Sequence, residues 1–212
     1  MASATPEHAP ITYRLDLGEG WYCIRLDEHA EADVKTFLDV MFDGVPADAA
    51  EQTRTLITTQ FTTQIAAARA KRGIELLIPA PKPHATVLPA AVVLVAEVVI
   101  PAPIVPDPVD VVARVAREAP NARTGVIAGS VAVRIDHSEA DAEAEASDDT
   151  PPSRNRIEYV IAVPNDPRWL SIDLSVQAVD GFDTDQAIAK FDQAVAELTW
   201  SDSALLEDGQ AG

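Results

Sequence analysis

Apolar and polar residues alternate along several short stretches of the chain, a period of two that is typical of β-strands with one buried face. The alternation is clearest in residues 156–163 and 169–178, which flank the turn sequence Asn165-Asp166-Pro167 and predict a β-hairpin. Residues 90–100 are apolar at both parities except at Glu97. This pattern predicts a strand covered on both faces, with Glu97 near a strand end or an edge.

A second hairpin is predicted near the start of the chain. Residues 11–17 and 22–26 both alternate, and Gly18-Glu19-Gly20 breaks the run between them. The first of these strands could instead be a loosely held arm. Shorter apolar runs predict further strands at residues 74–78, 126–127 and 131–135, the last two being separated by a bend at Gly129.

Four stretches repeat apolar residues at every third or fourth position, which predicts amphipathic helices. The first helix stops at Asp43-Gly44, and the second begins at Pro46. The second ends at Lys71-Arg72-Gly73, where we expect the glycine to form the C-cap. Their apolar stripes are Val34, Phe37, Leu38 and Met41 in the first helix, and Ile57, Phe61, Ile65 and Ala68 in the second.

The third and fourth helices begin with capping signals. Asp107 precedes a proline that suits the first helical position, and Phe182-Asp183-Thr184 supplies an N-cap for the last helix. Their predicted stripes are Val109, Val112, Ala113 and Ala116 in the third helix, and Ile188, Phe191, Ala194, Val195 and Leu198 in the fourth.

The order of these elements predicts a single α+β domain over residues 11–200, with a mostly antiparallel sheet flanked by helices. Adjacent strands come in pairs that can form hairpins, which favours antiparallel pairing. Residues 139–153 hold six acidic residues and almost no large apolar ones, so we expect a disordered acidic insertion there. Residues 1–10 and the acidic tail 201–212 are expected to be disordered.

The formal net charge of −18 over 212 residues narrows the choice of partners. Such a surface repels phosphate backbones and anionic lipids, so we expect neither nucleic-acid binding nor membrane docking. The first ten residues lack the basic start and apolar run of a secretory signal, and the longest apolar stretch is far short of the roughly 20 residues that span a bilayer. We therefore expect a cytoplasmic protein that binds another protein. That partner could be basic, and the chain could also form a homo-oligomer.

Two histidines are the best candidates for metal binding. His29 lies within two positions of three acidic residues, and His137 lies beside Asp136 and Glu139. Both have a plainer interpretation. The acids around His29 suit a solvated helix N-terminus, and His137 sits where a strand runs into an acidic loop.

No other pattern of catalysis is found. Cys23 is the only cysteine, which excludes an intrachain disulfide and a cysteine-built zinc site, and we interpret it as a small, partly buried apolar residue. Gly129-Ser130 lacks the surroundings of a nucleophile elbow, and Gly18-Glu19-Gly20 lacks the third glycine of a phosphate loop. We predict no catalytic residue, metal or cofactor, and hence no enzyme.

The order of elements resembles that of the PsbP-like α/β/α sandwich superfamily over roughly residues 20–200. The resemblance is carried by Gly20-Trp21-Tyr22 before the first long helix, by the hairpin in residues 156–178, and by residues 182–200. It implies a mostly non-enzymatic role, because members include subunits that brace larger assemblies, lipoproteins, and chaperones of secretion effectors. This chain departs from the lipoproteins, since no lipidated cysteine follows a signal, and it carries the acidic insertion. Its Ala/Val/Asp-rich, Lys-poor composition resembles that of bacterial proteins from high-GC genomes.

Trp21, Trp169 and Trp200 are the candidate partner contacts. Each lies at the edge of a predicted element, and tryptophan is frequent at interfaces because its ring is large and carries one donor. Packing at the edge of the core is the alternative. We expect a non-enzymatic protein-interaction module, an accessory subunit or chaperone of a larger bacterial assembly such as a secretion or injection system. The alternative is a protein that binds a small apolar ligand between sheet and helices, near Tyr159 and Phe191.

Overall fold

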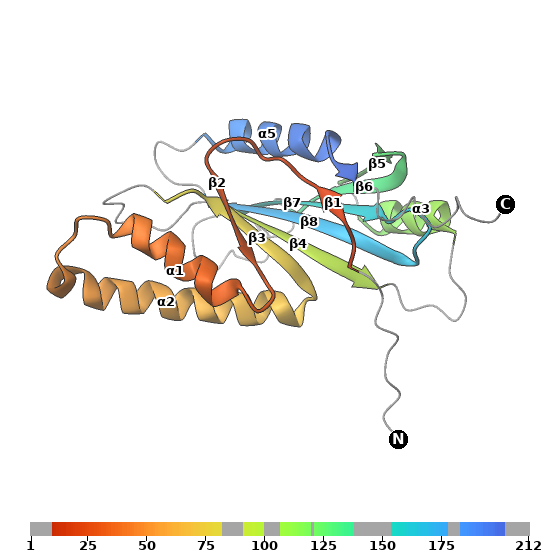
Figure 1. Cartoon of the computed structure of the whole chain (residues 1–212). Helices are drawn as coiled ribbons and strands as arrows, with labels where there is room; N and C mark the ends of the chain where they lie inside the picture. The colour runs from red at the N-terminus through yellow and green to blue at the C-terminus, as the bar shows by residue number, and fades with distance from the viewer. Residues whose placement is uncertain are drawn as a thin grey trace, which may run out of the picture.

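The computed structural model describes residues 10–81, 91–99, 107–119, 121–137, 154–177 and 183–201. Within them a broad antiparallel β-sheet forms the middle layer, with helices on both of its faces (Figure 1). The prediction of an α+β fold with a mostly antiparallel sheet flanked by helices is therefore confirmed.

The main sheet consists of β2 (Trp21–Arg25), β3 (Gly73–Pro79), β4 (Ala91–Val99), β5 (Ala122–Ile127), β6 (Ser130–Asp136), β7 (Arg154–Ala162) and β8 (Arg168–Gln177). Its spatial order is β2-β3-β4-β8-β7-β6-β5, and all neighbours are antiparallel. The predicted hairpin before and after Asn165 is β7–β8, and Asn165 takes a left-handed φ of 55° in its turn.

The helices are α1 (Ala30–Met41), α2 (Ala47–Ala70), α3 (Pro108–Glu118) and α5 (Thr184–Ala196). Two predicted N-caps are confirmed. The carboxylate of Asp107 accepts a hydrogen bond from the Val109 amide at 2.8 Å, and that of Asp183 accepts one from the Gln186 amide at 2.9 Å. Each carboxylate satisfies a backbone donor that has no partner inside the helix.

Three helices cover one face of the sheet, which we call the α1–α3 face. Trp169 of β8 is paired with Val98 of β4, and both pack against α3. Val92 and Leu94 have the same parity in β4 as Val98, and they pack against the cluster that α1 and α2 bury. Because residues of one parity share a face, α1, α2 and α3 lie on the same side.

The opposite face, the α5 face, holds the largest apolar cluster. Ile172 and Leu174 of β8 meet Phe191 and Val195 of α5 there. A small two-stranded sheet, β1 (Tyr13–Arg14) with β9 (Thr199–Trp200), also packs on this cluster. Figure 1 shows α5 and the α1–α2 pair on opposite sides of the main sheet.

The predicted N-terminal hairpin is wrong. β1 pairs with β9 at the other end of the chain, with Tyr13 opposite Trp200 and Arg14 opposite Thr199, and not with β2. Gly18 and Gly20 take φ values of 81° and 101° and redirect the chain between the two strands. An alternating pattern identifies which side chains are buried, but it does not specify which strand they pair with.

The predicted C-cap glycine is also wrong. Arg72, not Gly73, takes the left-handed conformation after α2, with φ 59°. Gly73 is the first residue of β3, and a Cβ added there would lie 2.5 Å from Leu26 Cδ1 and 2.8 Å from the Ala68 carbonyl oxygen. The glycine is therefore needed for close packing and not for a turn.

The apolar stripe predicted for α3 is correct at Val112 and wrong at Val109 and Ala113, which are exposed. Val109 is 60 % exposed, whereas Val111 and Val112 are buried and Val115 packs beside them. A short helix with apolar residues on several sides has no unique stripe, so the sheet surface beneath it decides which side chains are buried. The stripes predicted for α1 and α2 are confirmed as buried, and α5 buries all of its predicted residues except the partly exposed Ile188.

Several predictions lie outside the described residues. These are the disordered segments 1–10, 139–153 and 201–212, apart from Pro10 and Ser201. Among the described helices none combines the length and apolar character needed to cross a bilayer.

Candidate functional site

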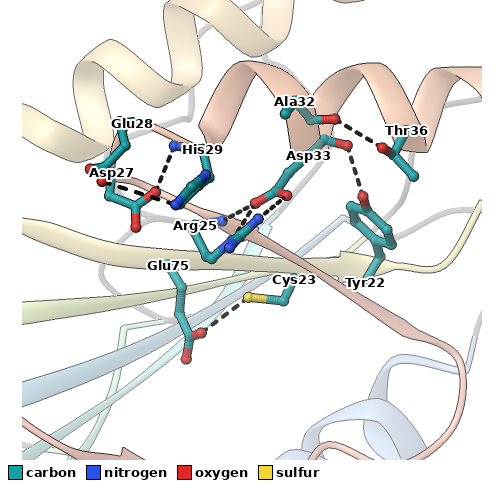
Figure 2. A network of polar contacts seen from close by, with 10 residues as sticks. All are labelled: Tyr22, Cys23, Arg25, Asp27, Glu28, His29, Ala32, Asp33, Thr36 and Glu75. Atoms are coloured by element: carbon teal, nitrogen blue, oxygen red, sulfur yellow. Dashed lines mark hydrogen bonds and ion pairs between the residues drawn. The ribbon is translucent and has the colours of Figure 1, made fainter.

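The first metal candidate, His29, lies where β2 leads into α1. Figure 2 shows Asp27, Glu28 and His29 together at this corner. The Asp27 carboxylate accepts a hydrogen bond from the His29 amide at 2.8 Å, and His29 Nε2 lies 4.0 Å from Glu28 Oε1. The His29 ring is half exposed and the Glu28 side chain is 83 % exposed. Two flexible, exposed groups do not form a preorganised metal site.

The side chain that organises this corner is Asp33 of α1. It accepts hydrogen bonds from Arg25 Nε at 2.9 Å, Arg25 Nη2 at 2.6 Å and the Arg25 amide at 3.1 Å. The Tyr22 hydroxyl donates to the Asp33 carbonyl oxygen at 2.8 Å (Figure 2). The hydrogen bonds from Arg25 hold the pKa of the Asp33 carboxyl below its usual range. This contact fixes α1 against β2, an edge strand.

Cys23 lies next to a carboxylate on the α5 face. Its Sγ donates to Glu75 Oε2 at 3.1 Å, and the Tyr13 hydroxyl donates to Glu75 Oε1 at 2.6 Å. Cys23 is exposed, so its predicted partial burial is wrong, but loss of solvation at its sulfur, together with the Glu75 hydrogen bond and charge, raises the pKa of the thiol to about 12. A reactive cysteine needs the opposite environment, one that favours the thiolate.

The second metal candidate, His137, belongs to a polar group on the α1–α3 face. His137 Nε2 lies 2.9 Å from Glu158 Oε2, and the Ser171 hydroxyl donates to Glu158 Oε1 at 3.0 Å. Of the neighbouring acids expected from the sequence, Asp136 has the strand parity of the other face, and Glu139 lies outside the described residues. No group of three metal-ligating side chains is found among the described residues.

The order of these three groups does not suit nucleophilic catalysis. A serine nucleophile needs an imidazole base at its hydroxyl, with a carboxylate behind the imidazole. Here the carboxylate of Glu158 stands in the middle, so Ser171 and His137 bind it from two sides. The arrangement ties the end of β6 to β7 and β8, because His137 follows β6, Glu158 lies in β7 and Ser171 lies in β8.

A bidentate ion pair extends this polar group. Arg156 donates to Asp173 Oδ1 with Nε at 3.1 Å and to Oδ2 with Nη2 at 2.5 Å, and the Asp173 side chain is 14 % exposed. Glu158, Ser171 and Asp173 were not predicted from the sequence. A signal was present, since Ser171 and Asp173 alternate with the buried apolar residues of β8. This alternation indicated which face of β8 carries polar side chains. It did not indicate which side chains of the neighbouring strands contact them.

The three tryptophans do not form one surface. Trp169 is 4 % exposed and packs under α3, so it cannot reach a partner while α3 is in place. Trp21 and Trp200 are half-buried and pack against the cluster of the α5 face. The indole N–H of Trp200 is buried and has no hydrogen-bond partner in the described structure. Their part in partner binding stays a prediction.

A groove of about 390 Å³ runs between α1 and α2 on the outer surface. Its floor is apolar and belongs to the buried stripes of both helices. Charged and hydroxyl-bearing side chains form its walls. The lining residues are Glu31, Val34, Lys35, Leu38, Arg54, Thr58, Phe61, Thr62 and Ile65.

Most polar groups of this groove are already satisfied within the protein. The hydroxyls of Thr58 and Thr62 donate to carbonyl oxygens four residues back, at 2.8 and 2.9 Å. Lys35 and Arg54 both bind Asp39. Glu31 is the exception, because no described residue pairs with its carboxylate. Among the described residues, the groove therefore offers an apolar floor and the unpaired carboxylate of Glu31.

The apolar pocket was expected near Tyr159 and Phe191, two residues that contact each other on the α5 face. The two rings pack edge to face, with centroids 5.8 Å apart, and the Tyr159 hydroxyl donates to Asp192 at 2.8 Å. A second hollow, a shallow one of about 450 Å³, lies beside Tyr13 and Glu75.

Comparison with known proteins adds no identification. Neither the protein-family models nor the curated proteins compared with this chain give a match.

Proposed function

We propose that this protein is a non-catalytic protein-interaction module that binds its partner in the groove between α1 and α2. The observation that carries the proposal is the chemistry of that groove: an apolar floor made by Val34, Leu38 and Phe61, and the lining carboxylate of Glu31, which pairs with no described residue. A partner segment that fits presents an apolar side chain to the floor and a Lys or Arg to Glu31.

The partner is expected to be basic. The net charge of −18 raises the local concentration of cationic segments and speeds their encounter with the surface. The polar groups around Ser171 and Cys23 support a non-catalytic role, because their hydrogen bonds go to carboxylates that do not activate them. A role as accessory subunit or chaperone of a larger bacterial assembly, of PsbP-like kind, is the form of this proposal that the resemblance favours.

A small apolar ligand is the second candidate occupant. The groove volume of about 390 Å³ lies within the range of ligand sites. One feature favours a protein instead: the hydroxyls of Thr58 and Thr62 and the cations of the groove are already paired, so little remains to orient a small molecule. This alternative is tested with an apolar fluorescent probe bound in the groove. If lipids from a cell extract displace the probe and proteins from the same extract do not, the small ligand is favoured.

The proposal is tested with two matched pairs of variants. Thr62→Arg places a large side chain in the groove, whereas Thr63→Arg places it at an exposed neighbouring position that does not line the groove. Glu31→Gln removes the free charge, and Glu51→Gln removes a charge from an exposed position outside it. Affinity purification from the source cell at low salt, followed by direct titration of the captured partner, should show weaker binding for the first member of each pair only.

The outcome that contradicts the proposal is equally specific. If a captured protein binds Thr62→Arg and Glu31→Gln as tightly as the wild type, the groove is not its binding site. If no stable partner is recovered at low salt, the interaction-module function itself is contradicted.

A further inference from the structure

The two edge strands of the main sheet, β2 and β5, differ in how their outward backbone groups are covered. At one edge, the Arg25 amide of β2 donates to Asp33 Oδ2, so a side chain of α1 occupies part of the edge. At the other edge, β5 pairs with β6 and with no other described strand, and four of its six residues are exposed. Figure 1 shows β5 at the end of the sheet away from α1 and α2. An open strand edge is a template for pairing with a further strand.

The register defines which backbone groups of β5 face outward. Ile127 and Ser130 flank the two-residue turn at Ala128 and Gly129, whose φ values are 49° and 78°. In such a hairpin the flanking pair is hydrogen-bonded, and every second residue after it follows the same pattern. Gly125 therefore bonds to β6, while the amides and carbonyls of Thr124 and Val126 point away from the sheet.

The side chains of this edge suit pairing. Val126 is 70 % exposed, the most exposed of the large apolar side chains in the described structure. Gly125 has no heavy atom within 4 Å of the place where a Cβ would stand, so a second backbone can approach it closely. β5 contains no carboxylate, and its one charged residue is Arg123.

We propose that β5 pairs antiparallel with β5 of a second copy of this chain, forming a symmetric dimer with a continuous sheet. The register that suits the outward groups places Gly125 of one copy opposite Gly125 of the other. Thr124 of each copy then faces Val126 of the other, and the two residues exchange backbone hydrogen bonds, about four in all across the interface. The pairing is isologous, as a twofold axis requires.

Charge argues for a second copy over a different partner. A basic partner would be attracted by carboxylates, so an edge free of them would have no advantage. A second copy of a chain with a net charge of −18 is repelled everywhere except where carboxylates are missing. The β-branched pair Thr124 and Val126 around a central glycine is also self-complementary, since it presents the same surface to its own symmetry mate.

Sedimentation velocity and light scattering across a wide dilution series test this dimer. We expect the mass to rise from the monomer value of 22.6 kDa towards twice that value, and to rise at lower protein concentration when salt is added, since salt screens the repulsion. Hydrogen exchange of the Thr124 and Val126 amides should slow as the protein concentration rises, while exchange at the β2 edge should not change.

Two variants and one control make the test specific. Val126→Lys places a charge on the edge, and Thr124→Pro removes an outward amide that β6 does not use; each should weaken the dimer by about tenfold or more without unfolding the monomer. Val109→Lys, at an exposed valine of α3, should leave the dimer unchanged. A monomer at all concentrations and salts, or a dimer that survives both edge variants, would overturn the proposal. Neither result bears on the groove between α1 and α2.

Discussion

At the scale of single residues, the polar side chains of this protein stabilise its structure through carboxylates that hold several donors at once. Asp33 binds Arg25 in this way, Glu75 binds Cys23 and Tyr13, and Glu158 binds His137 and Ser171. Residue chemistry in the sequence cannot reveal such groups, because their members come from different strands and helices. The sequence indicated His137 as a candidate, but not its partner Glu158, which lies on the neighbouring strand β7.

The environment of Cys23 makes a direct prediction about its reactivity. Alkylation by iodoacetamide near pH 8 should be much slower than for a free thiol, because the pKa of about 12 leaves almost no thiolate. Glu75→Gln removes the adjacent charge, so the thiol pKa should fall and alkylation should speed up severalfold. Glu19→Gln, at an exposed turn, is the control. Equal rates for wild type and Glu75→Gln would show that loss of solvation alone protects the thiol.

The same thiol makes stability depend on pH. Its folded-state pKa of about 12 exceeds its ordinary value of 9.0, so the protonated form favours folding. This contribution is complete below pH 9.0 and is lost as the pH rises towards 12. Urea unfolding at neutral and alkaline pH should show a smaller alkaline loss of stability in Cys23→Ser than in wild type. An identical loss in both would assign the effect to other groups, such as Tyr13.

Asp33→Asn should destabilise the fold. One oxygen that accepts from Arg25 becomes a donor, and the exposed Arg25 guanidinium loses its counter-charge, so the free energy of unfolding should fall. Because the pKa of Asp33 is lowered by folding, its contribution is present above the ordinary pKa and is lost as the pH falls through the folded-state value. Urea unfolding measures both effects. Asp39→Asn, on an exposed ion pair of α1, should have a smaller effect, and a larger one would contradict this view.

At the scale of elements, the positions of helices and strands followed from local patterns, whereas their partners did not. α2 and the β7–β8 hairpin were predicted because each contains its whole signal in consecutive residues. β1 was assigned to the wrong partner because β9, a strand of only two residues, gave no signal of its own. The face of α3 was assigned correctly only in part, because the surface of β5 and β6 beneath it decides which valines are buried.

The junction between α2 and β3 can be tested with glycine variants. Gly73→Ala places a methyl group against Leu26 and the backbone of Ala68, and this overpacking should lower stability by about 1–3 kcal/mol. Gly125→Ala adds the same methyl group where no atom lies within 4 Å, so the monomer should keep its stability. Thermal unfolding of the two variants under dilute conditions distinguishes them, and equal midpoints would show that the junction can relax.

At the scale of the whole molecule, the net charge of −18 acts in opposite directions on the two proposed interfaces. Binding of a basic partner in the α1–α2 groove should weaken as salt rises, because the attraction is screened. Pairing of two copies through β5 should strengthen, because the repulsion is screened. Titrations of partner binding and of self-association between low and high salt should therefore have slopes of opposite sign. Slopes of the same sign would mean that charge does not control one of the two interfaces.

The sequence by itself determined the α+β class, most element positions, the caps at Asp107 and Asp183, and the acidic surface, because these depend on neighbouring residues or on composition. Only the tertiary structure decided that β1 meets β9, that Glu158 stands between His137 and Ser171, that an apolar groove lies between α1 and α2, and that β5 is an open edge. Each of these depends on residues far apart in the chain. The apolar pattern of an element specifies which of its side chains are buried. The packing of the whole molecule decides which other elements those side chains contact.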